Sequence, residues 1–528
     1  MVAKKLLPIF LLSMALSACN GEGPVQSQQS QDSSNQPQSQ SQDQSQGGGD
    51  QSQSQGGGEA GGIAKPTQTD VTIDFWHTFG QGIEEGVKAE VDKFVDLVKK
   101  NDGVNLKINL SKEGSYTDIQ SKIDQGFSAG NVPTLAVAYP DHVANYLGKH
   151  AKYVQNLDDY INDPNIGFGK EAYLGDKKGN EVYDKDDFIG VFMDEGTNYA
   201  VQGTYSLPFM KSTEVLFYNL DMVKKAMDIY KPEISRNESK IKEFIESMTW
   251  DQLMEISTII KNNKATIAPS LEYPVFYDSD GNFFISQLYQ RGIKYSSFDA
   301  QRNPQVDFEQ TAEFNKVVTM VDELRQNHKD GLVTTKGTKG EYSSYSFTDE
   351  LCAFAIGSSG GAGYNSPKSD SFTFGVAPVP YKGSAQYVTQ GVTLTILRNP
   401  SYSDADNDAR VYYAWKFAKY ITNPEVNAVL CVEDSQGYVP VRESAYETDD
   451  YLEFLSDDTN IYSSTAKIVM KVNESADYIN TPVFSGSSYL REQCGGAIAT
   501  LFKADDNSQN LSTSDQLRTV ISNAKSHF

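Results

Sequence analysis

The fold of this chain is decided by residues 71–110, which read VTIDFWHTFGQGIEEGVKAEVDKFVDLVKKNDGVNLKINL. The alternating, β-branched run at 71–75 predicts a strand. In the next segment, 84–101, apolar residues recur at helical spacing from Val87 to Val98, so this segment predicts an amphipathic helix. Residues 106–110 then predict a second strand, and the whole stretch forms a strand-helix-strand unit.

The stretch that follows extends this unit. Residues 116–129 carry apolar side chains in helical register and are followed by Gly130, which predicts a helix and its end. The continuous apolar run at 133–139 is typical of a buried parallel strand. The order β-α-β-α-β predicts an α/β fold with a parallel sheet that is covered by helices on both faces.

The rest of the body continues to alternate short apolar runs with amphipathic segments. A capping box predicts a helix that starts after Thr249, with Gln252 three residues on, and Pro424 lies where another helix begins. Residues 160–200 are rich in Gly, Asp, Asn and Lys and predict an irregular excursion. Further strands are predicted at 215–218, 351–356 and 374–379, and further helices at 309–327 and 410–421.

The first 66 residues carry a separate signal. Lys4 and Lys5 precede an apolar run that is too short to span a bilayer, which predicts a removable export signal over residues 1–18. It ends in Leu-Ser-Ala-Cys19, which resembles the lipobox of bacterial lipoproteins and predicts a lipidated Cys19. An ordinary secretory signal with a chance cysteine is the alternative. Residues 20–66 are almost only Gln, Ser, Gly and Asp, so we expect a disordered tether between the lipid and a folded body outside the cytoplasm.

The composition of the chain limits the classes of function that it can have. The formal net charge is −24 at pH 7, so the protein should repel nucleic acid and anionic lipid surfaces. About 460 residues follow the tether, which is too many for one compact core. Cys352, Cys431 and Cys494 lie in apolar or small-residue contexts and predict buried free thiols, although a bridged pair stays open. The His and Cys residues show no metal-ligand spacing, so neither a metal nor a cofactor is predicted.

Five segments, in this order, resemble family 1 extracellular solute-binding proteins, the lipoprotein receptors of ABC importers. They are Thr72–His77, Tyr205–Phe209 with Ser212–Asn219, Ala353–Gly360, Gln390–Val392 and Gly437–Val441. The resemblance implies a periplasmic-binding-protein-like type II fold with two α/β lobes, joined by crossover hinges, and a ligand cleft between them. It also implies hinge closure around a small-molecule ligand, ABC permease subunits as partners, a monomeric receptor and no catalysis.

On this resemblance we expect lobe one at 69–207 plus 391–432, and lobe two at 208–390 plus 433–528. The first two crossovers are expected near Gly203–Pro208 and Gln390–Val392. The predicted ligand is a carbohydrate, because tyrosines offer a flat apolar face and a hydroxyl, and the chain has 30 of them.

Several residues are expected to contact the ligand. Trp76 and His77 end the first strand, at the sheet edge where open α/β folds bind ligands, with core packing and a structural histidine as the alternatives. Asp141 is predicted to accept hydrogen bonds from adjacent sugar hydroxyls, or else to cap the helix that follows. The remaining contacts are predicted for three reasons: a hydroxyl or backbone group can reach the ligand, a glycine lets the backbone approach it closely, or the position resembles a ligand contact of the family. These residues are Tyr116, Ser212, Tyr277, Asp278, Ser359, Gly360, Gly391, Tyr438 and Arg491.

Other functions stay as alternatives. Lys211 and Arg491 could hold a phosphate, so a glycerol-3-phosphate or polyol-phosphate receptor is the second candidate ligand class. Residues 357–361 fit Gly-x-Ser-x-Gly, the nucleophile elbow of α/β hydrolases, but the only later histidine is His527 near the end of the chain. A glycosidase would need only a carboxylate pair, and a surface adhesin would share the lipid and the tether.

Overall fold

The structure is a computed structural model, and it describes residues 62–170, 184–367, 371–432, 437–475 and 477–528. Cys19 and the predicted export signal lie outside these residues, as does nearly all of the predicted tether. No helix in the described ranges is both long enough and apolar enough to cross a bilayer.

The core of the fold is one mixed sheet with the strand order β2-β1-β3-β11-β4-β9-β5-β8, to which β10 adds beside β4 and β12 beside β11. A separate hairpin, β6-β7, lies outside it. The strands are β1 (Asp70–His77), β2 (Asn105–Lys112), β3 (Leu135–Ala138), β4 (Leu207–Asn219), β5 (Val275–Tyr277), β6 (Ser296–Phe298), β7 (Pro304–Val306), β8 (Val333–Thr335), β9 (Phe354–Ser358), β10 (Phe374–Pro378), β11 (Gln386–Ile396) and β12 (Asp477–Ile479).

Helices precede and follow β4 in the chain. Those before it are α1 (Gln81–Asp102), α2 (Tyr116–Ala129), α3 (Pro140–His150), α4 (Asp158–Ile161) and α5 (Gly190–Asp194). Those after it are α6 (Leu220–Tyr230), α7 (Glu238–Glu246), α8 (Trp250–Asn262), α9 (Lys264–Ile267), α10 (Asp280–Gln290), α11 (Thr311–Lys329), α12 (Lys336–Lys339), α13 (Ser343–Thr348), α14 (Asp404–Ile421), α15 (Pro424–Val432), α16 (Asp449–Leu455), α17 (Ile461–Ser475), α18 (Ser487–Asp506) and α19 (Thr513–Lys525).

The predicted strand-helix-strand unit is confirmed. β1 pairs in parallel with both β2 and β3, and α1 and α2 lie between them in the chain. The parallel arrangement predicted for this stretch is therefore confirmed, while the sheet as a whole is mixed, because β11 runs antiparallel to β3 and β4, and β4 runs antiparallel to β9 and β10. These antiparallel strands join the two parallel parts of the sheet.

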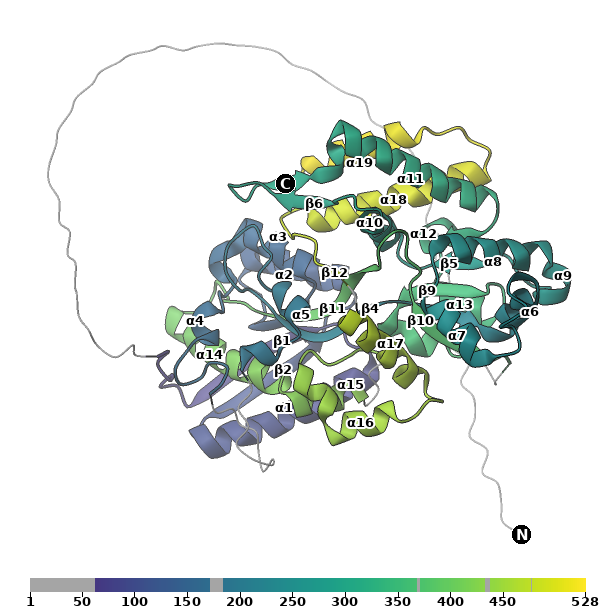
Figure 1. Ribbon diagram of the computed structural model, residues 1–528. Helices are drawn as coiled ribbons and strands as arrows, with labels where there is room; N and C mark the ends of the chain where they lie inside the picture. Colours follow the sequence, from purple (N-terminus) through teal and green to yellow (C-terminus); the bar gives the residue numbers. More distant parts are fainter. Residues whose placement is uncertain (1–61, 171–183, 368–370, 433–436, 476) are drawn as a thin grey trace, which may run out of the picture. The chain divides into compact units, whose positions relative to one another are not determined.

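Two hydrophobic clusters form around this sheet. The first gathers side chains of β1, β3, α1, α2 and α14, and it also takes residues between Val439 and Val469. The second gathers side chains of α6, α8, α10, α11, α18 and α19. β4 and β11 contribute to both, since Phe209 and Val392 belong to the first cluster while Tyr218 and Val388 belong to the second. Figure 1 shows β4 and β11 between α1 and α14 on one side and α6 and α8 on the other.

The two long strands meet at a glycine. Residues 389–392 of β11 pair with residues 210–213 of β4, and the register shifts between Val392 and Thr393. Gly391 has φ +98°, a conformation that side-chain-bearing residues rarely adopt. A Cβ at this position would lie 2.3 Å from the Met210 carbonyl oxygen, so only glycine lets β4 and β11 approach this closely.

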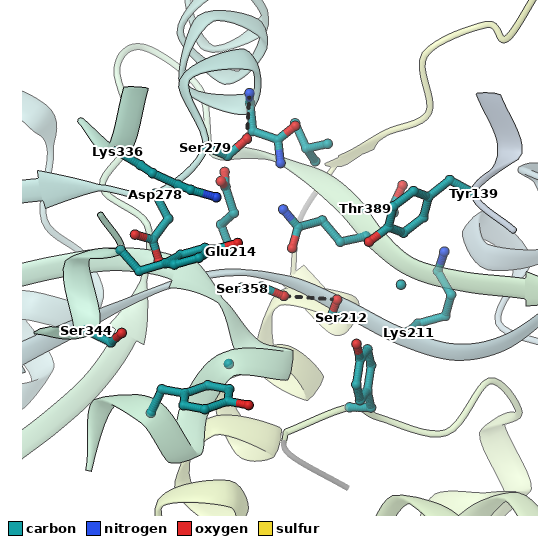
Figure 2. Close-up of a pocket in the computed structure, with 18 of the residues that line it drawn as sticks. Tyr139, Lys211, Ser212, Glu214, Asp278, Ser279, Lys336, Ser344, Ser358 and Thr389 are labelled. Atoms are coloured by element: carbon teal, nitrogen blue, oxygen red, sulfur yellow. Dashed lines mark hydrogen bonds between the residues drawn. The ribbon is translucent and has the colours of Figure 1, made fainter. Parts of the chain in front are cut away.

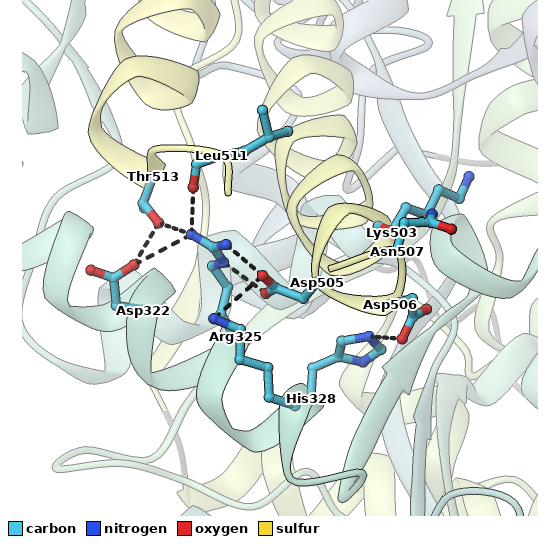
Figure 3. Close-up of polar contacts among 10 residues, drawn as sticks. Asp322, Arg325, His328, Lys503, Asp505, Asp506, Asn507, Leu511 and Thr513 are labelled. Carbon is cyan, nitrogen blue, oxygen red and sulfur yellow. Dashed lines mark hydrogen bonds and ion pairs between the residues drawn. The ribbon is translucent and has the colours of Figure 1, made fainter. Parts of the chain in front are cut away.

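Helix α18 is fixed at its end by a buried arginine of α11. Arg325 donates through Nε and Nη2 to the two carboxylate oxygens of Asp505, at 2.8 and 2.6 Å. Its Nη1 also donates to the Leu511 carbonyl oxygen at 3.0 Å and to the Thr513 hydroxyl at 2.9 Å, which ties α19 to the same group (Figure 3). Arg491, a residue of the site described next, lies near the opposite end of α18.

Candidate functional site

A cavity of about 1040 Å³ lies against the two strands that join the hydrophobic clusters. β4 contributes Lys211, Ser212 and Glu214 to its wall, and β11 contributes residues 388–391. Figure 2 shows Glu214, Asp278 and Lys336 on one side of the cavity and Tyr139 and Lys211 on the other. Because β4 and β11 pass from one cluster to the other, the cavity lies where the two parts of the fold meet.

Tyrosines dominate the apolar part of the wall. Tyr342, Tyr345 and Tyr364 line the cavity with 51%, 62% and 69% of their surface exposed, which is unusual for large rings in a folded chain. Tyr139 and Tyr438 also line it and are half-buried. The wall therefore offers aromatic faces to a ligand without any rearrangement of the core.

Two cations of the wall are already paired with carboxylates. Lys211 Nζ lies 2.5 Å from Glu195 Oε2, and both side chains are buried. Arg491 Nη1 lies 3.2 Å from Oδ2 of Asp141, which is buried behind the wall. Each pair is formally neutral, so these two residues add no net positive charge to the cavity.

Two buried acids complete the polar wall. Burial raises the pKa of Glu214 to about 8, although the hydrogen bond from the Tyr277 hydroxyl at 2.5 Å opposes the rise. Burial also raises the pKa of Asp278 to about 6, against the hydrogen bond that the Ser343 backbone N–H donates at 2.6 Å. At pH 7 Glu214 is therefore mostly neutral and Asp278 mostly ionised.

Of the residues predicted to contact ligand, five line the cavity: Ser212, Asp278, Gly391, Tyr438 and Arg491. Another five lie directly behind the wall. Tyr116 stacks on Tyr139 with ring centroids 4.2 Å apart, Asp141 pairs with Arg491, and Tyr277 donates to Glu214. The Ser359 hydroxyl faces the Thr213 backbone N–H at 3.4 Å, and Gly360 lies against the ring of Tyr438.

Trp76 and His77 lie elsewhere. Trp76 is half-buried and packs against the first hydrophobic cluster. His77 is fully buried and stacks on Phe79 with centroids 4.8 Å apart, and its Nδ1 accepts a hydrogen bond from the Phe79 backbone N–H. Burial lowers the pKa of His77, so the ring is held neutral. For both residues the geometry favours the structural alternatives, while their assignment as ligand contacts stays a prediction.

The helix-capping alternative for Asp141 is wrong. Helix α3 begins at Pro140 with Tyr139 as its N-cap, and no side chain caps it. Asp141 instead supplies the carboxylate for Arg491, which follows it by 350 positions in the sequence. This side chain therefore positions a cation of the cavity.

Several residues of the cavity wall give little signal in the sequence. The exposed tyrosines stand among small polar residues, in Tyr342-Ser-Ser-Tyr345 and close after the Gly-Ser turn that precedes Tyr364. An aromatic ring in such a context is the available signal, since it has few apolar neighbours in sequence to pack with. Glu195, Glu214 and Lys336 give no comparable signal, because a single charge in sequence does not reveal burial.

The Gly-x-Ser-x-Gly segment has no hydrolase geometry. Ser359 is fully buried at the start of a 3₁₀ helix, Ser359–Asn365. The His527 ring stacks on Tyr489, with centroids 3.9 Å apart, and its Nδ1 lies 3.0 Å from the Asn523 carbonyl oxygen. Within the described ranges these groups hydrogen-bond to other residues, so they form no nucleophile–base pair. The same ranges hold no cluster of three His, Cys, Asp or Glu side chains that could bind a metal, and the three cysteines are buried free thiols, as predicted.

Comparison with known proteins defines the class of this chain. The profile of the bacterial extracellular solute-binding protein family matches residues 92–458, which is more than half of the chain. The chain therefore belongs to this family, whose members serve as the binding components of ABC importers. The resemblance seen in the sequence is confirmed.

Individual relatives are distant. The sn-glycerol-3-phosphate-binding periplasmic protein UgpB of Escherichia coli K12 is 24% identical over 391 residues, which is 72% of this chain and 76% of that protein. Among solved structures, Lmo0181 of Listeria monocytogenes in complex with cycloalternan aligns with a TM-score of 0.61 at 14% identity, over 87% of this chain and 98% of that one. UgpB of Mycobacterium tuberculosis with glycerophosphocholine aligns with a TM-score of 0.60 at 16% identity, over 86% and 97%.

These alignments establish the fold. The chain has the type II periplasmic-binding-protein architecture of two α/β lobes joined by crossover strands, and β4 and β11 are the described strands that connect them. The lobe boundaries given above stay a prediction.

Proposed function

We propose that this protein is a lipid-anchored receptor that binds a carbohydrate outside the cytoplasm and delivers it, unaltered, to the permease of an ABC importer. The observation that carries this proposal is the cavity wall, which combines exposed tyrosine rings with polar groups and holds two of its cations, Lys211 and Arg491, in ion pairs. Sugar rings have apolar faces that stack on aromatic rings and hydroxyls that need both donors and acceptors.

The size of the cavity favours an oligosaccharide. Typical small-molecule pockets enclose about 300–1000 Å³, and this one reaches about 1040 Å³. Three tyrosines, Tyr342, Tyr345 and Tyr364, would provide stacking surfaces for more than one sugar ring.

A phosphate-bearing ligand is the second candidate, and the relatives named for glycerol-3-phosphate binding favour it. Phosphate recognition needs convergent cationic donors. Lys211 and Arg491 are the residues proposed for this role, but each is already engaged by a carboxylate, at 2.5 and 3.2 Å. An anionic ligand would have to compete with those carboxylates, which is why we place it second.

Closure is proposed to occur at the two connecting strands, where Gly391 and the register shift after Val392 supply the irregular backbone. Lobe one is proposed to contain 69–207 and 391–432, and lobe two 208–390 and 433–528. Residues between Val439 and Val469 pack into the first hydrophobic cluster, which favours moving this segment to lobe one. We further propose that the receptor acts as a monomer and makes or breaks no bond in its ligand.

Calorimetry with purified protein tests the ligand class. The probes are maltotriose, mannobiose, glycerol-3-phosphate and glycerophosphocholine. We expect saturable one-to-one binding of a sugar, and mass spectrometry should recover that sugar unchanged. Binding of only the phosphate compounds would move the assignment to the second candidate, and a chemically altered ligand would contradict the receptor proposal.

The lipid anchor needs its own test, because Cys19 lies outside the described residues. Wild-type protein expressed with its signal should partition into detergent and with the membrane fraction, whereas a Cys19→Ala variant should be released or retained as unlipidated precursor. Identical partitioning of the two proteins would refute the anchor without touching the ligand assignment.

A further inference from the structure

One acid of the cavity wall is left with an unused oxygen. Glu214 lies on β4, opposite Ser358 of β9, and only 3% of its surface is exposed. Its Oε2 accepts the hydrogen bond from the Tyr277 hydroxyl at 2.5 Å. Its Oε1 is buried and has no hydrogen-bond partner within the described ranges, although the residue lines the cavity. A buried polar atom without a partner costs about 1–3 kcal/mol, so this oxygen calls for an explanation.

The groups packed around Glu214 do not supply a positive charge. From β5 the Tyr277 hydroxyl faces it, and Asp278, the next residue, adds a negative charge that disfavours its ionisation. From α10 the Asn282 amide is a hydrogen-bond donor close to the Glu214 carboxyl group and favours its ionised form, although its geometry does not complete a hydrogen bond to Oε1 within the described ranges. Lys336 of α12 lines the same side of the cavity, where it acts on Asp278 and lies 3.6 Å from the ring centroid of Tyr342. Burial therefore dominates and raises the pKa of Glu214 to about 8.

We propose that Glu214 is a specificity-determining residue: it is held as a neutral carboxylic acid and donates the proton on Oε1 to an oxygen of the bound ligand. The inference rests on the proposed carbohydrate function and adds the chemistry of one contact. An ionised carboxylate only accepts hydrogen bonds, whereas a protonated one also donates. Ring and glycosidic oxygens of a sugar only accept, so a neutral acid can recognise them and a carboxylate cannot. The proton stays on Glu214, and no bond of the ligand changes.

This proposal fixes the pH dependence of binding. The binding-competent form is the protonated one, so affinity is nearly complete at about pH 7, is about halved at about pH 8 and falls further as the pH rises. Each pH unit above the pKa reduces the protonated fraction about tenfold, so we expect binding about tenfold weaker at about pH 9 than at about pH 7. Asp278 titrates about two units lower and does not contribute in this window.

Three variants test the contact, with maltotriose and mannobiose as probes in calorimetry at about pH 7, 8 and 9. Glu214→Gln keeps an acceptor for Tyr277 and an N–H donor for the ligand, so we expect it to bind with an affinity that no longer depends on pH. Glu214→Ala should bind at least tenfold more weakly than wild type at about pH 7. Glu233→Gln, at an exposed position, is the control and should retain the loss of affinity at high pH.

A second measurement needs no ligand. The infrared carbonyl stretch of a protonated carboxyl group should be present in wild-type protein at about pH 7, absent from the Glu214→Gln variant and lost from wild type above about pH 8. Absence of that band at neutral pH, a pH dependence that survives in Glu214→Gln, or equal weakening by Gln and Ala would each overturn the proposal. Failure of both sugars to bind refutes the proposed function instead, and the infrared result distinguishes the two failures.

Discussion

Replacement of Gly391 by alanine should both destabilise the protein and weaken ligand binding. This residue has φ +98°, and a side chain in such a conformation costs about 1–3 kcal/mol. The added Cβ would also lie 2.3 Å from the Met210 carbonyl oxygen, 2.7 Å from Lys211 Cα and 3.0 Å from the Ser212 backbone nitrogen. These are all backbone atoms of β4, so no side chain can move aside to relieve the contact.

Relief requires the two strands to separate by about an ångström, because ordinary contacts at Cβ begin near 3.4 Å. The separation weakens the hydrogen bonds between β4 and β11, each of which contributes about 0.5–1.5 kcal/mol. Backbone strain and lost hydrogen bonds together predict a loss of about 3–5 kcal/mol, a large part of the typical 5–15 kcal/mol of a folded protein. Since Gly391 and Ser212 both line the cavity, the affinity for ligand should fall as well.

Urea unfolding followed by circular dichroism measures the first effect, and calorimetry measures the second. The matched control is Gly496→Ala on α18, where a Cβ meets no atom within 4 Å. There alanine should stabilise by up to about 1 kcal/mol because of its higher helix propensity. A Gly391→Ala protein that unfolds at the same urea concentration as wild type and binds ligand equally well would refute the close-approach argument.

Three further predictions follow from buried charge and exposed rings. Arg325→Ala removes four hydrogen bonds and leaves the Asp505 carboxylate without its main partner. Urea unfolding should therefore show that the free energy of unfolding falls by about 3–5 kcal/mol. An unchanged urea midpoint would contradict this prediction. Burial raises the pKa of Asp505, but the hydrogen bonds from Arg325 outweigh burial and hold this pKa below its ordinary value. The ionised carboxylate therefore stabilises the fold above about pH 4, and this stabilisation is lost on acidification. The Asp505→Asn variant should show a flatter dependence of the urea midpoint on pH. Tyr364→Ala should change the free energy of unfolding by no more than about 0.5 kcal/mol, because the ring is 69% exposed. The affinity for sugar, measured by calorimetry, should drop about tenfold. An affinity equal to that of the wild type would exclude stacking on this ring.

Local structure was predictable where the periodicity of the sequence is strong. The helix expected at 116–129 has the same bounds in the structure, and the capping box at Thr249 and Gln252 is present. The strand expected at 215–218 is in fact β4, Leu207–Asn219, with all thirteen residues buried. The first half of β4 contains Pro208, Lys211 and other polar residues, so its sequence does not have the pattern of a buried strand. Lys211 can be buried because Glu195 neutralises it, and nothing nearby in the sequence indicates this pairing.

The pairing of distant residues limited the prediction of the site. Arg491 and Asp141 were each expected near the ligand, but their ion pair spans 350 positions and no local pattern encodes it. The strand-end rule that selected Trp76 and His77 does not take into account what covers the strand. Here the chain turns back, and Phe79 stacks on His77 and closes that end. Neither residue lines the cavity, although both follow the rule.

The charge of the cavity constrains its ligand more than any single contact does. The chain carries a formal net charge of −24, so an anion approaches against the field of the whole molecule unless the site holds unpaired cations. Lys211 and Arg491 are instead matched one to one by Glu195 and Asp141, and a third cation of the wall, Lys336, acts on the Asp278 carboxylate beside it. Separating the buried Lys211–Glu195 pair to bind a phosphate would leave the Glu195 carboxylate buried without its partner, which costs about 3–5 kcal/mol, and separating the half-buried Arg491 from Asp141 would leave a second buried carboxylate. An uncharged ligand with many hydroxyls leaves both pairs intact and still uses the remaining donors and acceptors of the wall, and for this reason we propose a carbohydrate.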